Sequence, residues 1–203
     1  MTSLLIKTEL TPLMVDVSSL IPQAKMTDEQ FYAFCQANRD LRIERSANGE
    51  VIVMPPAFSD TGNRNLRITQ QLANWADQDG TGEVFDSSAG FTLPNQSVRS
   101  PDAAWIKRDR WNALSAAQKA SFAPICPDFV VELRSVSDTL TGLQEKMREY
   151  IENGAHLGLL IDCKNCTVHI YRQGRSPEIL ADPHGVKCEP ELPGFMLQMA
   201  KIW

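Results

Sequence analysis

The stretch that decides the fold is CPDFVVELRS, residues 126–135, which predicts a buried β-strand containing a carboxylate. Glu132 interrupts an otherwise apolar run, and burying an unpaired charge is costly. Because side chains alternate along a strand, Glu132 and Arg134 point to one face. The other face is apolar and consists of Phe129, Val131 and Leu133. We therefore expect the Glu132 face to meet either solvent or a polar pocket.

This strand is followed by the strongest helical pattern in the chain, SDTLTGLQEKMREYIENG, residues 137–154. Gly154 marks its C-terminal end. Its apolar stripe consists of Leu143, Met147, Tyr150 and Ile151. Lys146 precedes Tyr150 by four residues, so the two lie on one side of the helix. We expect the helix to pack on the sheet, with Lys146 reaching towards Glu132.

A second carboxylate, Asp102, opens another predicted strand, SPDAAWIK, residues 100–107. If this strand neighbours the Glu132 strand, the two carboxylates lie side by side, and like charges raise one pKa unless a cation sits between them. Such a pair suits Mg²⁺ or Mn²⁺, because Mg²⁺ is typically held by one or two carboxylates together with waters and phosphate oxygens. The alternative is that Glu132 and Arg134 form an ion pair on the wet face of an edge strand.

A second Pro-Asp dipeptide precedes the Glu132 strand itself. Asp128 follows Pro127 as Asp102 follows Pro101. However, Asp128 is four residues from Glu132 on the same strand, which is about 13 Å at the rise of a strand. We therefore prefer Asp102 as the acid that acts together with Glu132.

The rest of the chain completes an α/β pattern: a mixed β-sheet flanked by helices, with an extra N-terminal helix and β-hairpin. Residues 1–25 have weak periodicity and two prolines, so we expect an N-terminal arm followed by a single domain over residues 26–203. The further predicted elements are a helix over 26–40, a hairpin over 41–56, a helix over 60–80 and a hairpin over 157–174. The apolar stripe predicted for the 60–80 helix consists of Leu66, Ile68, Leu72 and Trp75.

Composition limits the environment and the partners of the protein. The hydrophobic fraction of 43% over 203 residues favours a globular chain. No apolar window is long enough to cross a membrane, and five cysteines, an odd number, suit reduced thiols, so we expect a cytoplasmic protein without a membrane partner. The net charge of −5 means that nucleic acid would need a local basic patch or a metal ion to bind.

Four segments are informative when taken together: RSPDAAW (99–105), CPDFVVELRS (126–135), LQEKMREYIENGAHLGLLID (143–162) and VHIYRQG (168–174). In combination they resemble the Uma2 family (DUF820) of the restriction-endonuclease-like nucleases, and the similarity runs from about Leu41 to Trp203. The resemblance implies a restriction-endonuclease-like fold. The signature of these nucleases is Pro-Asp, a gap, then Asp or Glu, any residue, and Lys.

Carried over to this chain, the resemblance assigns Asp102 as the aspartate of the signature and Glu132 as its second acid. The lysine position, two residues after Glu132, is Arg134, which stays protonated and so stabilises charge but hardly serves as a base. Lys146 is the other candidate for the ammonium group, and both stay open for that role. Glu44 is a further candidate metal ligand, with a solvated hairpin charge as the alternative interpretation.

The resemblance implies a Mg²⁺-dependent nuclease that hydrolyses phosphodiester bonds, with DNA as the expected partner. Asp102 and Glu132 would hold Mg²⁺ or Mn²⁺, and Lys146, with or without Arg134, would orient water or offset charge on phosphorus. Two alternatives stay open: a catalytically inactive binding or assembly module of the same fold, and a metal-dependent hydrolase of a small phosphate ester. A homodimer is left open as well.

Overall fold

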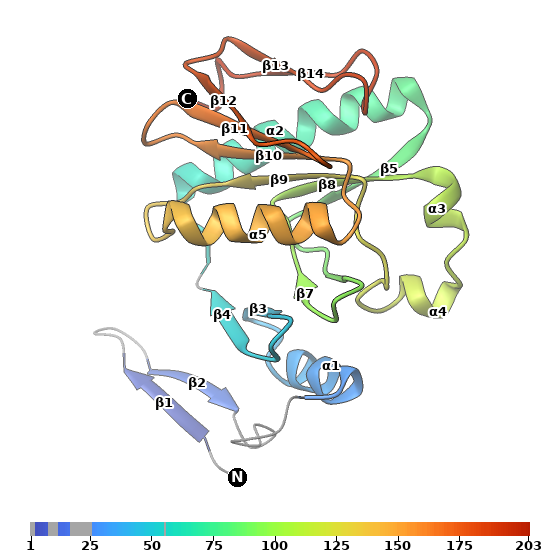
Figure 1. The fold of residues 1–203 in the computed structure, drawn as a ribbon. Helices are drawn as coiled ribbons and strands as arrows, with labels where there is room; N and C mark the ends of the chain where they lie inside the picture. The colour runs from blue at the N-terminus through green and yellow to red at the C-terminus, as the bar shows by residue number, and fades with distance from the viewer. Residues whose placement is uncertain (1–2, 8–11, 17–25, 55) are drawn as a thin grey trace.

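The computed structural model describes residues 3–7, 12–16, 26–54 and 56–203 of the chain. Its centre is a mixed six-stranded sheet with helices on both faces (Figure 1). In spatial order, the strands are β12 (Glu178–Ala181), β11 (Thr167–Arg172), β10 (Leu157–Asp162), β9 (Phe129–Leu133), β8 (Ala103–Lys107) and β5 (Gly82–Asp86).

The strand predicted from the quoted stretch is β9, and it lies in the interior of the sheet. It pairs in parallel with β10 and antiparallel with β8, and all five of its residues are buried. Helix α5 (Leu140–Glu152) connects β9 to β10, because parallel neighbours need a crossover connection. The interpretation of β9 as a wet edge strand is therefore wrong.

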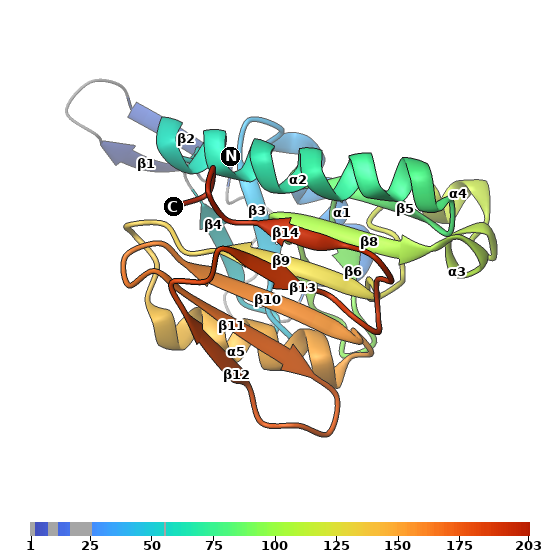
Figure 2. The ribbon, with the colours of Figure 1, turned by 90° about the horizontal axis from the view of Figure 1, so that it is seen from above.

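Two apolar cores fill the two faces of this sheet. Helix α2 (Ser59–Asp79) and the hairpin of β13 (Gly185–Lys187) and β14 (Met196–Gln198) cover one face, and α5 covers the other (Figure 2). The β9 residues on the α2 face are Phe129, Val131 and Leu133. Val130 belongs to the α5 face, so the predicted alternation along β9 is confirmed.

Helix α2 differs from its prediction in one respect. Its predicted end is confirmed, because Gly80 caps the helix with φ of +70°, a conformation that favours glycine. Leu66, however, is 59% exposed. The buried stripe of α2 consists of Asn65, Ile68, Leu72 and Ala76. A polar residue thus lies on the core-facing side of the helix, one position before the exposed leucine.

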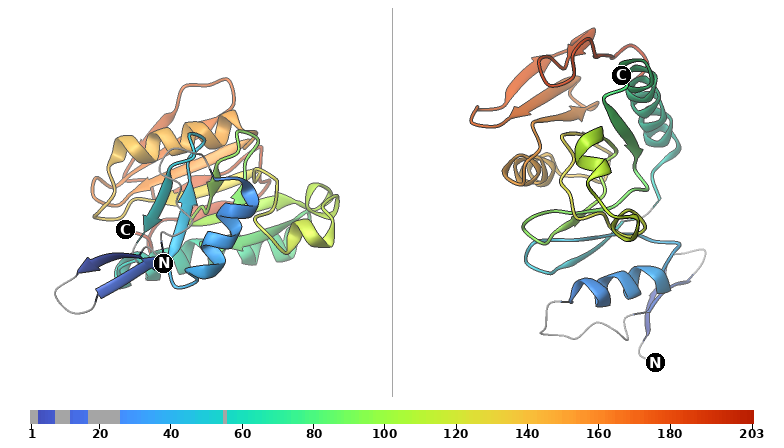
Figure 3. Two further views of the ribbon diagram at one scale, coloured as in Figure 1. Left: turned by 90° about the horizontal axis from the view of Figure 1, so that it is seen from below. Right: turned by 90° about the vertical axis from the view of Figure 1, so that its right-hand side faces the viewer.

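A smaller four-stranded sheet lies at the end of the molecule opposite β13 and β14 (Figure 3). Its strands, in spatial order, are β4 (Val51–Met54), β3 (Arg42–Arg45), β7 (Val98–Arg99) and β6 (Phe91–Thr92). The predicted helix and hairpin are α1 (Asp28–Ala37), which begins with a capping box at Thr27, and the β3–β4 pair. This layer positions Arg42 and Glu44 of β3 against the larger sheet.

Two short helices and an N-terminal pair of strands complete the described chain. Helices α3 (Arg108–Asn112) and α4 (Ala116–Lys119) connect β8 to β9. The predicted arm over residues 1–25 lies largely outside the described residues, apart from the antiparallel backbone strands β1 (Ser3–Lys7) and β2 (Pro12–Asp16), so its separation from the domain stays a prediction. In the described ranges, no helix combines the length and apolar character needed to cross a bilayer.

Candidate active site

Asp102 and Glu132 come together where β8 and β9 lie side by side. The backbone N–H of Asp102 donates to the Val131 carbonyl at 3.0 Å, and the Asp102 Oδ2 accepts from the Leu133 N–H at 2.8 Å. These bonds attach Asp102 to the residues on either side of Glu132. Asp102 is 7% exposed and Glu132 3%. The two predicted acids are thus neighbours in the fold, as expected for adjacent strands.

Helix α5 brings two groups to Glu132. The Lys146 Nζ lies 2.8 Å from Glu132 Oε1, and the Tyr150 hydroxyl donates to the same oxygen at 3.0 Å. Among the described residues, nothing donates a hydrogen bond to the other oxygen, Oε2. The predicted reach of Lys146 towards Glu132 is therefore present, and one Glu132 oxygen stays available for another partner.

Glu44 is enclosed by cations and a backbone amide. Its Oε1 accepts from Lys146 at 2.9 Å and from the Ser100 N–H at 3.0 Å, while its Oε2 lies 3.1 Å from Arg99. Arg99 in turn pairs with Glu149 at 2.6 Å. Glu44 is only 2% exposed, so its interpretation as a solvated hairpin charge is wrong. Its geometry orients Lys146, and its role as a metal ligand stays a prediction.

Arg134 is not brought to Glu132. Its guanidinium forms an ion pair with Asp162 at 2.8 Å and donates from Nε to the Asp138 carbonyl at 3.3 Å. The alternative of a Glu132–Arg134 ion pair is therefore wrong. Of the two candidates for the ammonium role, the structure places Lys146 beside the acids and Arg134 beside Asp162.

The electrostatics of the cluster set its protonation. Burial, reinforced by the charges of Asp102 and Glu44 and opposed by Lys146, raises the pKa of Glu132 to about 7. Burial alone would lower the pKa of Lys146, but Glu132 and Glu44 outweigh it and raise that pKa above its ordinary value. Burial alone would raise the pKa of Glu44, but Lys146, the Ser100 N–H and Arg99 hold it below its ordinary value. Lys146 is therefore a fixed positive charge, and Glu132 exchanges a proton near neutral pH.

A cavity of about 130 Å³ opens on this cluster. Its charged lining residues are Arg42, Asp102, Glu132, Asp138 and Lys146, three acids against two cations, which gives a formal net charge of −1. Both cations are already engaged, Lys146 with the two glutamates and Arg42 with the Ser100 carbonyl at 2.7 Å and Asp102 at 3.5 Å. A phosphate entering this cavity therefore meets no cation without an acidic partner among the described residues that line it, although Arg42 Nε is buried there without a hydrogen-bond partner.

Asn65, Arg42 and Tyr150 belong to the site although sequence reasoning did not assign them to it. A signal existed for Asn65, because it precedes Ile68 and Leu72 by three and seven residues, on the core-facing side of its helix. Tyr150 was assigned only to the apolar stripe of its helix. Arg42 had no such signal, because its contact with Asp102 spans 60 residues of sequence.

The oxygens around the cavity fit a hard divalent ion. Asp102 and Glu132 supply two carboxylates, the number by which Mg²⁺ is commonly held. Asn65 Oδ1 is buried and has no hydrogen-bond partner in the described part of the chain, and Glu132 Oε2 is likewise without a donor. Within those ranges, no three or more His, Cys, Asp or Glu side chains gather as a metal cluster. The third acid that lines the cavity, Asp138, accepts from the Ser135 N–H and hydroxyl. The donor set is therefore the carboxylates of Asp102 and Glu132 with the Asn65 amide oxygen beside them.

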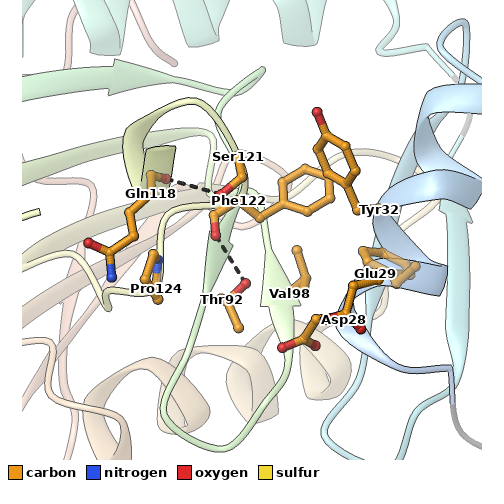
Figure 4. Close-up of a pocket in the computed structure, with 10 residues that line it drawn as sticks. Asp28, Glu29, Tyr32, Thr92, Val98, Gln118, Ser121, Phe122 and Pro124 are labelled. Atoms are coloured by element: carbon orange, nitrogen blue, oxygen red, sulfur yellow. Dashed lines mark hydrogen bonds between the residues drawn. The ribbon is translucent and has the colours of Figure 1, made fainter. Parts of the chain in front are cut away.

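A separate pocket of about 360 Å³ lies between α1 and the chain around Phe122 (Figure 4). Its walls include Phe31, Tyr32 and Phe122, whose rings are in contact, and Asp28 and Glu29 lie at its edge. None of the predicted site residues is among the described residues that line it. The chemistry of the acids therefore belongs to the smaller cavity.

The fold is that of a nuclease-like α/β protein. The chain is similar to a crystal structure described as a "putative nuclease belonging to DUF820 from Anabaena variabilis ATCC 29413", with a TM-score of 0.67 and 17% sequence identity, over 79% of this chain and 88% of that one. At this identity the likeness shows the fold alone, and it confirms the predicted mixed α/β fold with a sheet flanked by helices.

The family follows from the sequence. The model of the Uma2 family, described as "Putative restriction endonuclease", matches residues 28–200. The chain therefore belongs to the Uma2 family, and the resemblance found in its motifs is confirmed. No curated protein matches the chain.

Proposed function

We propose that this protein is a nuclease that hydrolyses phosphodiester bonds in DNA and depends on Mg²⁺ or Mn²⁺. The observation that supports this most directly is the meeting of two buried carboxylates, Asp102 and Glu132, with the Lys146 ammonium 2.8 Å from Glu132, in one cavity. The Uma2 match is consistent with action on nucleic acid. Asp102 and Glu132 are proposed to hold the ion.

A divalent ion held by Asp102 and Glu132 would supply Lewis-acid chemistry, which polarises a phosphate oxygen and lowers the pKa of a bound water. The residues of the chain have separate tasks around it. Asp102 is held rigid by the Leu133 N–H and Asn65, which fixes one carboxylate of the pair. Lys146 stays protonated, so it offsets negative charge that develops on the phosphate rather than removing a proton. Arg134, paired with Asp162, has no direct task in this scheme.

The charge of the cavity supports a role for a metal ion. The protein has a net charge of −5, and the charged residues that line the cavity, which are part of that total, have a formal net charge of −1. Negative charge on the protein and in the cavity repels the DNA backbone, so cations have to neutralise the phosphates that the protein contacts. A divalent ion held by Asp102 and Glu132 would make the formal charge of the cavity positive, so DNA binding and cleavage are expected to disappear together when the ion is removed.

The test is incubation of purified protein with supercoiled plasmid and with single-stranded DNA, each with Mg²⁺, Mn²⁺ or EDTA, beside an Asp102→Ala control. We expect cleavage with either ion, none with EDTA and none by the variant. Cleavage that survives Asp102→Ala would overturn the site. DNA retention without cleavage under all conditions would favour the binding module, and hydrolysis of bis(p-nitrophenyl) phosphate alone would favour a small phosphate ester.

A further inference from the structure

Asn65 is a polar residue on the core-facing side of α2. It is 9% exposed and shares the buried stripe of the helix with Ile68, Leu72 and Ala76. Leu66, the next residue along, is 59% exposed. If packing alone decided these positions, the leucine and the asparagine would be exchanged, because a buried amide requires partners for both of its polar atoms. A specific contact therefore holds Asn65 inside.

One half of the Asn65 amide has a partner and the other half has none. Its Nδ2 donates to Asp102 Oδ1 at 3.0 Å, which fixes the orientation of the amide, since the flipped group would set two oxygens against each other. Its Oδ1 is buried and accepts no hydrogen bond from any residue in the described ranges. Buried oxygens in folded proteins are satisfied by protein, water or an ion in the great majority of cases.

We propose that Asn65 is a third side-chain oxygen of the ion site, anchoring Asp102 through its Nδ2 and contributing its Oδ1 to the ion. This inference rests on the metal-dependent function proposed above. Asn65, Asp102 and Glu132 line the same cavity of about 130 Å³ and come from three different segments, α2, the residue before β8, and β9. An amide oxygen is a hard ligand that Mg²⁺ and Mn²⁺ accept beside carboxylates.

The rival explanation is that Asn65 only holds Asp102 in place. The two explanations differ in what an aspartate at position 65 does. Asn65→Asp removes the Nδ2 donor and sets a carboxylate against Asp102, so an anchor alone would be lost. A ligand would be kept, because the new carboxylate still presents oxygen to the ion and adds charge for it. Asn65→Leu has a similar size and removes both the donor and the oxygen.

The experiment is a Mn²⁺ titration of the full chain without DNA, by calorimetry and by electron paramagnetic resonance of free Mn²⁺. Asn65→Leu is expected to weaken Mn²⁺ binding about 10- to 100-fold, the usual effect of losing a group that supports a metal site. Asn65→Asp is expected to bind at least as tightly as the wild type, and Mn²⁺ is expected to raise its melting temperature by more than that of the wild type. The matched controls are Asn63→Leu and Asn63→Asp, exposed on the same helix, which should behave as the wild type.

Each result has one meaning. If Asn65→Leu, folded by circular dichroism, binds Mn²⁺ as tightly as the wild type, or if Asn65→Asp loses binding, Asn65 is no ligand and the inference is overturned. If the wild type itself binds no Mn²⁺, this inference and the metal-dependent function fail together. If binding depends on Asn65 as described while DNA stays uncut, the inference stands and the nuclease proposal fails.

Discussion

The two Pro-Asp dipeptides of this chain lie at opposite ends of one pair of strands and have different surroundings. Asp102 precedes β8 and Asp128 precedes β9, and these strands are antiparallel. Both carboxylates are buried. Asp128 accepts from the Lys107 N–H at 2.9 Å and forms an ion pair with Arg110 at 2.8 Å. Asp102 instead lies beside a second acid, Glu132, whose pKa is raised by burial and further by the charge of Asp102.

The difference shows that the residues around the aspartate in the fold, and not the Pro-Asp dipeptide itself, decide its chemistry. Arg110 offsets the charge of Asp128, and the His156 imidazole lies 3.6 Å from the same carboxylate, so Asp128 is a structural link between the start of β9 and α3. The Asp102 end gathers two carboxylates around a cavity whose two cations are already engaged. Acids that share a site without enough local positive charge favour a bound cation. The predictions below separate these two ends of the sheet.

The largest expected effect separates Asp102→Asn from Asp128→Asn. Loss of the Asp102 charge is expected to reduce DNA cleavage about 10³-fold, because several kcal/mol of charge stabilisation depend on the ion that Asp102 is proposed to hold. Asp128→Asn is expected to leave the cleavage rate within about threefold and to lower the free energy of unfolding by about 1–3 kcal/mol, because its ion pair is lost. Initial rates and urea denaturation measure the two effects. If both variants lost cleavage to the same extent while remaining folded, the different roles assigned to Asp102 and Asp128 would be contradicted.

The second prediction compares the two cations that compete for the ammonium role. Lys146→Met removes the positive charge beside Glu132, and cleavage is expected to fall about 10²- to 10³-fold, as when one transition-state donor is removed. It also leaves Glu44 and Glu132 buried with less compensation, so the free energy of unfolding is expected to fall by about 3–5 kcal/mol. Arg134→Met, which breaks the pair with Asp162, is expected to change cleavage by no more than about threefold.

The matched conservative variant for this comparison is Lys146→Arg. It keeps the positive charge, so it should recover most of the stability that Lys146→Met loses. Its cleavage rate then shows whether a guanidinium can replace the ammonium group at this position. If Arg134→Met abolished cleavage in a folded protein while Lys146→Met did not, the signature position would be the working one despite its distance from Glu132.

The sequence predicted the central strand and its helix because their patterns are local. The alternation along β9 and the helical spacing that brings Lys146 over Glu132 both follow from backbone geometry within about 20 residues. The same alternation gave a wrong expectation for Arg134. The strand ends at Leu133, so the period of two does not extend to the next residue, whose side chain turns to Asp162.

The contacts within the site that the sequence did not predict depend on long-range packing. Glu44 meets Lys146 across 102 residues, and that contact exists only because β3 of the small sheet lies against the larger one. No local period reports such a contact. For α2, the apolar pattern favoured Leu66 as a buried position, whereas the Asp102 carboxylate keeps Asn65 inside instead. A polar side chain on the core-facing side of a helix, such as Asn65, is thus the sequence feature that could have indicated this site residue.

The pH dependence of ion binding is expected to come from Glu132, beside Asp102, and not from Asp128 at the opposite end of the strand pair. The pKa of Glu132 is raised to about 7, so below pH 7 a proton occupies the carboxylate and competes with the ion. Mn²⁺ affinity is therefore expected to rise with pH, by up to about tenfold per unit between pH 5.5 and 7, and to level off above about pH 7.5. Titrations of Asp128→Asn should give the same curve. Glu132→Gln should bind weakly and lose this transition, and a transition that persisted in it would assign the proton to another group.

The smallest expected effect concerns Tyr150, whose hydroxyl donates to Glu132 Oε1 at 3.0 Å. A donor to a carboxylate favours its charged form, so Tyr150→Phe should raise the pKa of Glu132. A hydrogen bond to a charged group contributes about 1.5 kcal/mol, so the midpoint of the Mn²⁺ transition is expected to move up by about one pH unit. Tyr171→Phe is the matched control, because Tyr171 is buried in the same core without bonding the site. A midpoint that moved equally in both variants would assign the shift to general loosening of that core, and one that moved in neither would mean that the Tyr150 hydrogen bond does not contribute to the pKa of Glu132.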